Sequence, residues 1–198
     1  MLGANGVISG SLDGYEHRPE QLEMAEAVAT ALSRGEHLAV EAGTGVGKSF
    51  AYLLPAVLHA KAHPEDGPVV VSTRTIALQQ QLERKDLPFL ASVLDVPFRA
   101  VTAVGRNHYV CLRRMERARG EKGLFDVDRQ AQLDRVASWA FDTGLGLRSE
   151  LVEPVADEVW EEVQAEHGNC LHQACPYIEP CVWRAARRRL QTAEIVVV

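Results

Sequence analysis

The pattern of apolar and polar positions predicts three elements in the first third of the chain. Between Pro19 and Gly35, apolar residues recur at the spacing of one helix face: Leu22, Ala25, Ala29 and Leu32. Pro19 can occupy the first turn of that helix, and Gly35 lies just past its end. The short apolar run at 38–40 has the length of a strand, and a second helix is expected over 50–59.

The same alternation continues toward residue 105. Val69–Ser72 is interpreted as a buried strand, Ile76–Lys85 as a helix and Arg99–Val104 as a third strand. Strands that alternate with helices at this spacing predict an α/β fold with a parallel sheet.

The pattern changes after Gly105. Residues 106–119 carry five arginines and one glutamate, whereas residues 121–166 carry twelve acidic and four basic residues. Apolar residues align at helical spacing in two groups, Leu133, Val136 and Ala140, and Val159 and Val163. The segment is therefore expected to be a helical insertion at 106–190, between a first domain at 1–105 and a return strand at 191–198.

Composition adds few constraints. The chain has 198 residues, 46% of them apolar and 24% charged, which is ordinary for a soluble domain. No apolar run approaches the about 20 residues of a membrane span, and residues 1–14 lack the features of a signal peptide, so we expect a cytoplasmic protein without membrane association. The net charge of −6 means that any nucleic-acid binding must come from local basic patches.

A glycine-rich turn links the predicted strand at 38–40 to the helix that follows. Gly43, Gly45 and Gly47 are followed by Lys48 and Ser49, which is the phosphate-binding P-loop arrangement with Ala42 in place of the first glycine. Glycines let successive N–H groups point at an anion, and the helix N-terminus adds its positive end. The lysine can reach outer phosphates, and the serine hydroxyl can bind Mg²⁺. The alternative is a glycine-rich turn without a ligand.

Four cysteines, Cys111, Cys170, Cys175 and Cys181, are separated by fifty-eight, four and five residues. Disulfides are not expected in an intracellular nucleotide-binding chain, which leaves buried thiols or a metal site. The spacing matches neither the short C-x₂-C pairs of many zinc sites nor the ferredoxin run. A mixed zinc site with His108, His167 or His172 stays open.

Three further stretches, taken with the P-loop, resemble a known family. Arg18-Pro-Glu-Gln21, Glu41 to Ser49, and Val71 to Thr75 with Leu78, Gln81 and Leu82 resemble the Q-like motif, motif I and motif Ia of XPD/DinG-type superfamily 2 helicases. The stretch from Gly105 to Arg114 and the last three cysteines resemble that family's iron–sulfur region, with spacing like its bacterial DinG branch. The resemblance implies a RecA-like motor domain, present in part, with an iron–sulfur insertion.

The resemblance also implies an activity: a 5′-to-3′ DNA helicase that uses ATP and Mg²⁺, binds single-stranded DNA and carries a [4Fe–4S] cluster, with a role in DNA repair. Adenine would be recognised by Gln21 and Arg18. Phosphates and Mg²⁺ would be held by Gly43, Thr44, Gly45, Val46, Gly47, Lys48 and Ser49, of which Lys48 and Ser49 would be catalytic. The four cysteines would ligate the cluster, and Thr73, Arg74 and Thr75 would contact DNA, although Thr75 could simply cap the next helix.

Two arginine-rich segments flank the cysteines. Arg184, Arg187 and Arg188 lie near Trp183, and the segment at 106–119 includes Tyr109. A cluster would bring both segments together, and basic residues beside aromatics are typical of a single-strand DNA path. The alternative is a solvated arginine-rich helix.

The family's DEAH box has no counterpart in the chain. The only Asp-Glu pair, Asp157-Glu158, lies in a helical pattern and is interpreted as unrelated to an ATPase site. The DEAH box and the second motor domain would lie beyond Val198, so these residues alone are not expected to hydrolyse ATP. Two other functions remain open: an ATP-binding module with structural zinc, and a redox-responsive DNA-binding protein.

Overall fold

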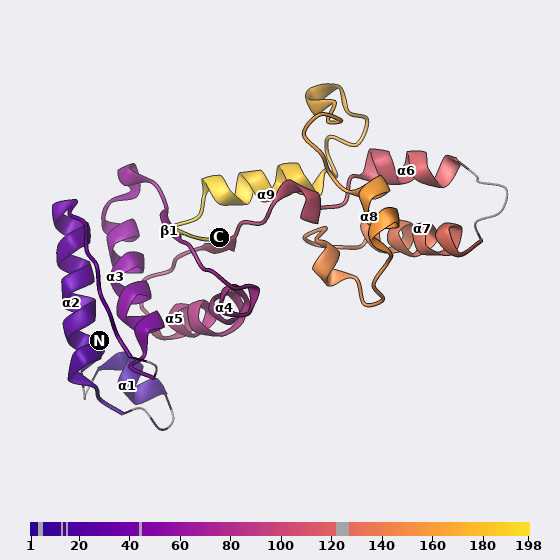
Figure 1. The fold of residues 1–198 in the computed structure, drawn as a ribbon. Helices are drawn as coiled ribbons and strands as arrows, with labels where there is room; N and C mark the ends of the chain where they lie inside the picture. Colours follow the sequence, from indigo (N-terminus) through magenta and orange to yellow (C-terminus); the bar gives the residue numbers. More distant parts are fainter. Residues whose placement is uncertain (4–5, 13, 15, 44, 122–126) are drawn as a thin grey trace. The chain divides into compact units, whose positions relative to one another are not determined.

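The computed structural model describes residues 1–3, 6–12, 14, 16–43, 45–121 and 127–198. The chain forms two compact units (Figure 1). Unit 1 comprises Met1–Ala103 and Thr192–Val198, and unit 2 comprises Val104–Gln191.

Unit 1 is an α/β unit with a small parallel sheet. Its elements are α1 (Val7–Ser11), α2 (Pro19–Arg34), α3 (Lys48–Ala62), η1 (Pro64–Asp66), β1 (Val69–Val71), α4 (Ile76–Gln81), η2 (Leu82–Asp86), α5 (Leu87–Val93), β2 (Ala100–Thr102) and β3 (Ile195–Val197). The strand order is β1-β3-β2, with Ile195 aligned to Val69 on one side and Ala100 on the other. The predicted parallel sheet is thereby confirmed.

The helices of unit 1 cover a single apolar core. Helix α2 begins at Pro19 and ends at Gly35, whose backbone is left-handed (φ 64°), as the sequence predicts. Helix α3 lies between α2 and the continuous segment formed by α4, η2 and α5 (Figure 1). The core is closed by side chains without measurable exposure: Leu53, Val57, Leu82, Leu90, Ile195 and Val197.

Two strand predictions need correction. Residues 38–40 form no strand, and Leu38 and Val40 are 45% and 44% exposed. A strand needs neighbours for its N–H and C=O groups, and the three strands pair among themselves without this segment. The second correction concerns β1, which is only partly buried because Val70 is 58% exposed.

Glu194 anchors the start of β3 to both sides of unit 1. Its carboxylate accepts a hydrogen bond from the Arg99 N–H at 2.6 Å and lies 3.3 Å from the Lys61 ammonium. Burial acts to raise the pKa of this carboxyl, but the Arg99 and Lys61 contacts outweigh it, so the pKa lies below its ordinary value.

Unit 2 is built from helices. Its elements are η3 (Arg106–His108), α6 (Leu112–Gly120), α7 (Val127–Ala140), η4 (Arg148–Glu150), α8 (Asp157–Val163), η5 (His172–Ala174) and α9 (Val182–Gln191). Extended pairing among its described residues is limited to two isolated bridges, Tyr109 with Leu147 and Val110 with Gln164. The predicted helical character of this region is confirmed.

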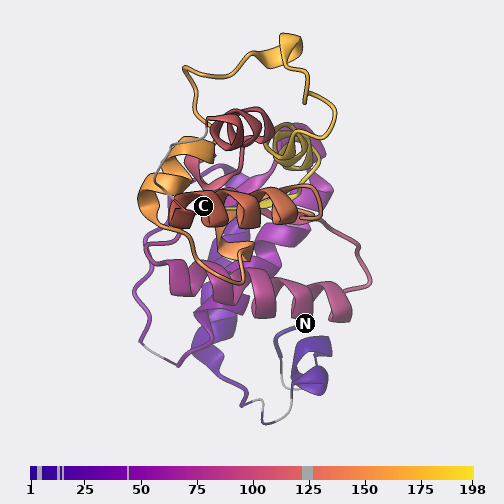
Figure 2. The same cartoon turned by 90° about the vertical axis from the view of Figure 1, so that its right-hand side faces the viewer.

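The core of unit 2 uses the apolar faces that the sequence predicts. Leu133, Val136 and Ala140 of α7 are buried, as are Val159 and Val163 of α8. Asp157 opens α8 and pairs with Arg148 at 2.7 Å, which is a structural role. The loop between α8 and α9 carries three cysteines and runs out above α6 in both views (Figures 1 and 2).

Candidate functional site

The glycine-rich turn leads directly into α3. Gly45 and Gly47 have left-handed backbones (φ 84° and 80°), which side chains other than glycine rarely adopt. The fifteen-residue helix begins at Lys48 and points its N-terminus at this turn. The Lys48 ammonium folds back and donates to the carbonyls of Ala42 and Gly43 at 2.9 and 2.8 Å. Free helix N–H groups and a cation therefore meet at one place, as phosphate binding requires.

Gln21 is the residue of α2 that reaches this turn. Its side chain is 3% exposed, and its amide Nε2 donates to the Gly47 carbonyl at 2.9 Å. Arg18, at the N-cap of α2, instead pairs with Glu16 at 2.9 Å. Of the two residues expected to recognise adenine, the structure thus brings Gln21 to the turn. Thr44 lies outside the described residues.

A cavity of about 360 Å³ opens between α2 and the turn. Its lining combines apolar residues with three glutamates: Glu20, Glu23, Met24, Ala27, Val40, Glu41, Ala42, Gly43 and Val46. It is a concave, partly apolar space next to the helix N-terminus, and such spaces are typical of ligand sites.

Ser49 occupies the first turn of α3, and Tyr52 lies three residues further along the same helix. Burial is the largest influence on Tyr52 and raises the pKa of its phenol. The Ser49 hydrogen bond lowers that pKa, the negative charge of Asp86 raises it, and the net shift is upward.

Residues 73–75 follow β1 at the carboxyl end of the sheet. The Thr75 hydroxyl accepts a hydrogen bond from the Leu78 N–H at 3.2 Å, which confirms that it caps α4. The Thr73 N–H donates to the Val198 carbonyl at 2.8 Å, and Arg74 is exposed. The exposed Arg74 and the two hydroxyls lie where parallel sheets usually bind ligands.

All four cysteines line a single cavity in unit 2. The thiols are half-buried and form no disulfide. The cavity has about 50 Å³ of free space, several times the about 10–15 Å³ that one water needs. In the described part of the chain, no three His, Cys, Asp or Glu side chains are close enough to hold one metal ion. Of the candidate histidines, only His172 is among the described lining residues.

Two arginines of α6 fasten the cysteine-bearing loop, a role that the sequence analysis missed. Arg113 donates to the Asn169 carbonyl, and Arg114 donates to the carbonyls of Gln164 and Glu161 at 3.0 and 2.6 Å. Arg114 also pairs with Glu166 at 2.7 Å and, by that hydrogen bond, holds the pKa of the carboxyl below its ordinary value. This role could have been inferred from the position of the two arginines, which directly follow Cys111 and Leu112 in the sequence.

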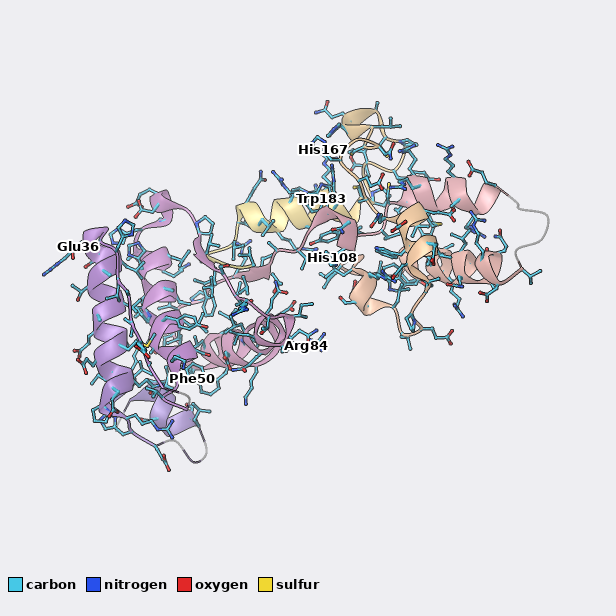
Figure 3. The ribbon with its side chains drawn as sticks, in the orientation of Figure 1. Glu36, Phe50, Arg84, His108, His167 and Trp183 are labelled. Carbon is cyan, nitrogen blue, oxygen red and sulfur yellow. The ribbon has the colours of Figure 1, made fainter. Side chains whose placement is uncertain are left out.

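Arg106 contacts α9 at the ring of Trp183, the residue that Figure 3 labels in this helix. The Arg106 and Arg187 guanidinium carbons lie 5.0 and 6.0 Å from the ring centre, which is cation–π distance. The ring centres of Tyr109 and Trp183 lie 5.2 Å apart in an edge-on arrangement. Tyr109 is only 3% exposed, so it cannot stack on a base. The expected pairing of a basic residue of 106–119 with α9 is present, with Trp183 as its aromatic centre.

Three arginines of α9 are exposed: Arg184, Arg187 and Arg188. Arg184 lies 3.5 Å from Glu179 at the surface. In the segment 106–119, Arg113 and Arg114 are engaged within unit 2, Arg119 pairs with Asp134, and the exposed Arg117 pairs with Glu121 at the surface. The cysteine cavity itself is lined by Arg106, Arg113 and Arg114, whereas the exposed arginines of α9 do not line it. Among the described helices, none is long and apolar enough to cross a membrane.

Comparison with known proteins identifies relatives over both units. Residues 19–108 match the family model described as DEAD/DEAH box helicase. The chain is 41% identical to the ATP-dependent helicase DinG of Mycobacterium tuberculosis, over 96% of this chain and 31% of the relative. It is 34% identical to the ATP-dependent DNA helicase YoaA of Haemophilus influenzae (100% of this chain, 30% of the relative). It is 36% identical to the ATP-dependent DNA helicase DinG of Escherichia coli (91% and 27%).

These matches confirm the resemblance to DinG-type helicases on which the motif assignments depend. The chain spans 31% or less of the length of each of these three relatives. The family model matches residues of unit 1 and the first few residues of unit 2, whereas the relatives are similar across both units.

Proposed function

We propose that this chain is the ATP- and DNA-binding N-terminal portion of a DinG-type DNA helicase that acts in the cytoplasm and moves 5′ to 3′ on single-stranded DNA. The observation that carries the proposal is the pairing of two sites in one chain. Unit 1 supplies the P-loop with Lys48 over its mouth, and unit 2 gathers four cysteines around one cavity. The relatives' names support this reading, since each is called an ATP-dependent helicase.

ATP would bind with its phosphates at the turn before α3. Lys48 would exchange two backbone carbonyls for phosphate oxygens, which are better partners for an ammonium because they carry full negative charge. Ser49 would offer its hydroxyl to Mg²⁺. The cavity between α2 and the turn could take the base, with Met24 and Val40 as apolar walls.

At the cysteine cavity we favour a [4Fe–4S] cluster over a single zinc ion, and the support is that all four cysteines line it. A cluster is held by four cysteine thiolates, one on each iron, so its ligands surround a volume instead of converging on a point. Four half-buried thiols around a cavity, without three convergent ligands among the described residues, match that requirement. Bound there, a cluster would supply structural cohesion for the loop between α8 and α9 and one-electron redox chemistry.

The chain offers residues that suit cluster retention. Arg113 and Arg114 donate hydrogen bonds to backbone carbonyls of the loop that carries three of the cysteines. The Arg106 Nε is buried and has no hydrogen-bond partner among the described residues. Hydrogen bonds and positive charge near the sulfurs are among the factors that tune such clusters.

In unit 2, single-stranded DNA would bind along the exposed arginines of α9 beside Trp183, and in unit 1 it would contact residues 73–75. Phosphates would pair with Arg184, Arg187 and Arg188, and Thr73, Arg74 and Thr75 would contact the backbone at the sheet edge. Trp183 is partly exposed and would be the aromatic residue of this path, where a base would take the place of an arginine that now lies over the ring.

Nucleotide binding is tested by titrating the chain with a fluorescent ATP analogue in the presence and absence of Mg²⁺. We expect binding that Mg²⁺ strengthens and that Lys48→Ala abolishes. The matched control is Lys61→Ala, which removes a lysine from the far end of the same helix. Equal binding by wild type and Lys48→Ala would contradict the assignment of the P-loop.

The cysteine site is tested by purification without oxygen, followed by a visible spectrum and by iron, sulfide and zinc analysis of the same sample. About four irons and four sulfides per chain with a broad visible band would support the cluster. One zinc in a colourless protein would instead favour the ATP-binding module with structural zinc. A reversible change of DNA affinity on oxidation would favour the redox-responsive protein.

DNA binding is tested by the salt dependence of affinity for a labelled oligothymidine. Each phosphate contact on a single strand contributes about 0.7 to the slope of log affinity against log salt, so Arg184/Arg187/Arg188→Gln should lower the slope by about 2. The control, Arg34/Arg84/Arg135→Gln, removes the same charge at exposed sites elsewhere (Figure 3 shows Arg84). Equal slopes for both triple variants would contradict the α9 path.

A further inference from the structure

The turn between Cys170 and Cys175 has a backbone conformation that its residues do not favour. Leu171 lies in the bridge region (φ −83°, ψ 1°), and His172 has a left-handed backbone (φ 48°). Among the described residues, His172 is the only one other than glycine with a positive φ. A left-handed backbone crowds the Cβ against a carbonyl oxygen, so it persists only where the surroundings require it.

The carbonyl groups of this turn have partners, whereas its N–H groups do not. The Leu171 carbonyl accepts a hydrogen bond from the Ala174 N–H at 3.0 Å. The His172 carbonyl accepts one from the Cys175 N–H at 3.1 Å. Within the described part of the chain, no acceptor is found for the N–H groups of Leu171, His172 and Gln173. Because a backbone N–H needs an acceptor, the turn offers three successive donors to a ligand or to water.

The order of backbone conformations gives these donors a common direction. A right-handed or bridge residue followed by a left-handed one curls the chain into a nest, in which successive N–H groups face one concavity. Nests bind anions and occur at phosphate sites and at iron–sulfur sites. Leu171 and His172 have this order of conformations. The turn therefore has the geometry of a site for a negatively charged group.

This nest lies in the wall of the cavity that the cysteines line. Leu171 and His172 are both among the lining residues of that cavity. Cys170 directly precedes Leu171, and Cys175 follows His172 by three residues. The three donors thus belong to a segment that has a cysteine at each end. A group bound by four cysteine thiolates carries negative charge on its sulfur atoms, which are the acceptors that such a segment would meet.

Contacts on both sides of the nest limit how far its backbone can relax. Arg113 of α6 donates a hydrogen bond to the Asn169 carbonyl, directly before Cys170. On the other side, Pro176 directly follows Cys175, whose backbone is extended (φ −74°, ψ 127°). A proline favours that extended conformation in the residue before it. The nest is therefore bounded by a fastened carbonyl and by a proline.

We propose that the turn at 171–173 is a backbone anion site for the group that the cysteines hold, and that its N–H groups donate hydrogen bonds to the sulfur atoms of a [4Fe–4S] cluster or of its thiolates. This inference rests on the proposed function, because it takes the cysteine cavity as a cluster site. The imidazole of His172 is then not a ligand, and the residue acts through its φ angle. Hydrogen bonds to the sulfurs favour the more negative, reduced cluster and so raise its reduction potential.

Two substitutions of His172 separate the backbone from the imidazole. His172→Gly removes the imidazole and retains the left-handed backbone, which glycine adopts readily. His172→Val opposes that backbone, because β-branched residues rarely adopt a positive φ. Each chain is purified without oxygen, and its iron content, its rate of iron loss to EDTA and its midpoint potential in a dithionite titration are measured.

We expect His172→Gly to match wild type in all three measurements. His172→Val should lose iron about 3-fold to 10-fold faster, the size expected for one hydrogen bond, and its midpoint potential should be more negative. The matched control is His167→Val, in the same loop (Figure 3 labels His167). It replaces an exposed imidazole at a position whose backbone is not left-handed and which does not line the cavity, so it should retain wild-type values.

Folding of the variants is checked by urea unfolding followed by tryptophan fluorescence, since all three tryptophans lie in unit 2. His172 is exposed, so its substitution should leave the unfolding curve unchanged. Should His172→Val nevertheless unfold unit 2, His172→Ala takes its place, because alanine also disfavours a positive φ but has no branched side chain. The expected changes are then in the same direction and smaller.

Three results would overturn the inference and leave the cluster assignment standing. The first is wild-type iron loss and potential in His172→Val. The second is equal defects in His172→Gly and His172→Val, because the imidazole would then be the group that matters. The third is faster iron loss at an unchanged potential, because the loop would then only be loosened. A wild-type chain that contains zinc and no iron would overturn the cluster assignment itself, and this inference with it.

Discussion

Gly47→Ala is the substitution whose cost the structure defines best. Gly47 has a left-handed backbone (φ 80°, ψ 34°), and a Cβ there would lie 2.1 Å from Nε2 of Gln21. The left-handed backbone costs about 1–2 kcal/mol for a residue other than glycine. Driving the buried amide off the Gly47 carbonyl costs about 1–3 kcal/mol more. We expect the free energy of opening of α2 and α3 to fall by about 2–5 kcal/mol.

Two further variants separate these contributions. Gly35 has nearly the same backbone (φ 64°, ψ 33°), and a Cβ there would have nothing within 4 Å, so Gly35→Ala should cost only the backbone part. In a Gln21→Ala background, Gly47→Ala should also cost only about 1–2 kcal/mol, because the clashing amide is gone.

Hydrogen exchange with mass spectrometry measures the opening free energy of α2 and α3 in these variants, because it resolves the opening of single helices. All three tryptophans lie in unit 2: Trp139, Trp160 and Trp183. Urea unfolding followed by tryptophan fluorescence therefore reports the stability of unit 2, and Gly47→Ala should leave that unfolding curve unchanged. Equal costs of Gly47→Ala with and without Gln21 would refute the reasoning, since they would mean that the amide does not oppose the new methyl group.

Three more predictions concern stability. Arg114→Ala should lower the unfolding free energy of unit 2 by about 2–4 kcal/mol in urea titrations, because it removes charged hydrogen bonds to the carbonyls of Glu161 in α8 and of Gln164, whereas the exposed Arg117→Ala should change it by less than about 0.5 kcal/mol. Leu133→Ala, at a fully buried site, should cost about 2–5 kcal/mol by the same titration, and a smaller loss would mean that the α7 core is loosely packed. The pKa of Glu194 is lowered by folding, so its contribution to the stability of unit 1 is present above about pH 4.3 and is lost as the pH falls through the folded value. Glu194→Gln should therefore flatten the acid side of the pH profile of hydrogen exchange in unit 1, and an unchanged profile would contradict this role.

The sequence predicts those elements whose signals are local. Helix α2 needs only its apolar face, Pro19 at the start and Gly35 at the end, and the structure has these bounds. The apolar faces of α7 and α8 are likewise visible as spacing, and their residues are buried as predicted. The strands β1, β2 and β3 were also foreseen, because short apolar runs alternate with helices.

Features that depend on distant partners were not predictable. The run at 38–40 has the composition of a strand, but a strand forms only where a neighbouring strand can pair with it. These residues lie outside the three-stranded sheet, and Leu38 and Val40 are exposed. No residue pattern in the sequence marks the π-turn at 82–86, which is visible only in the structure. The arginines of α6 were interpreted as a surface for DNA, whereas Arg113 and Arg114 turn inward to backbone carbonyls that lie about fifty residues later in the chain.

The strand order β1-β3-β2 has a consequence for synthesis of the protein. Of these three strands the middle one is synthesised last, more than ninety residues after β2, the later of the two outer strands. Unit 2 is contiguous in sequence and can fold, and acquire whatever its cysteines bind, while the sheet of unit 1 is still without its centre. The sheet of unit 1 is therefore completed only when β3 has been synthesised. Until it arrives, β1 and β2 expose open edges to chaperones and to other nascent chains.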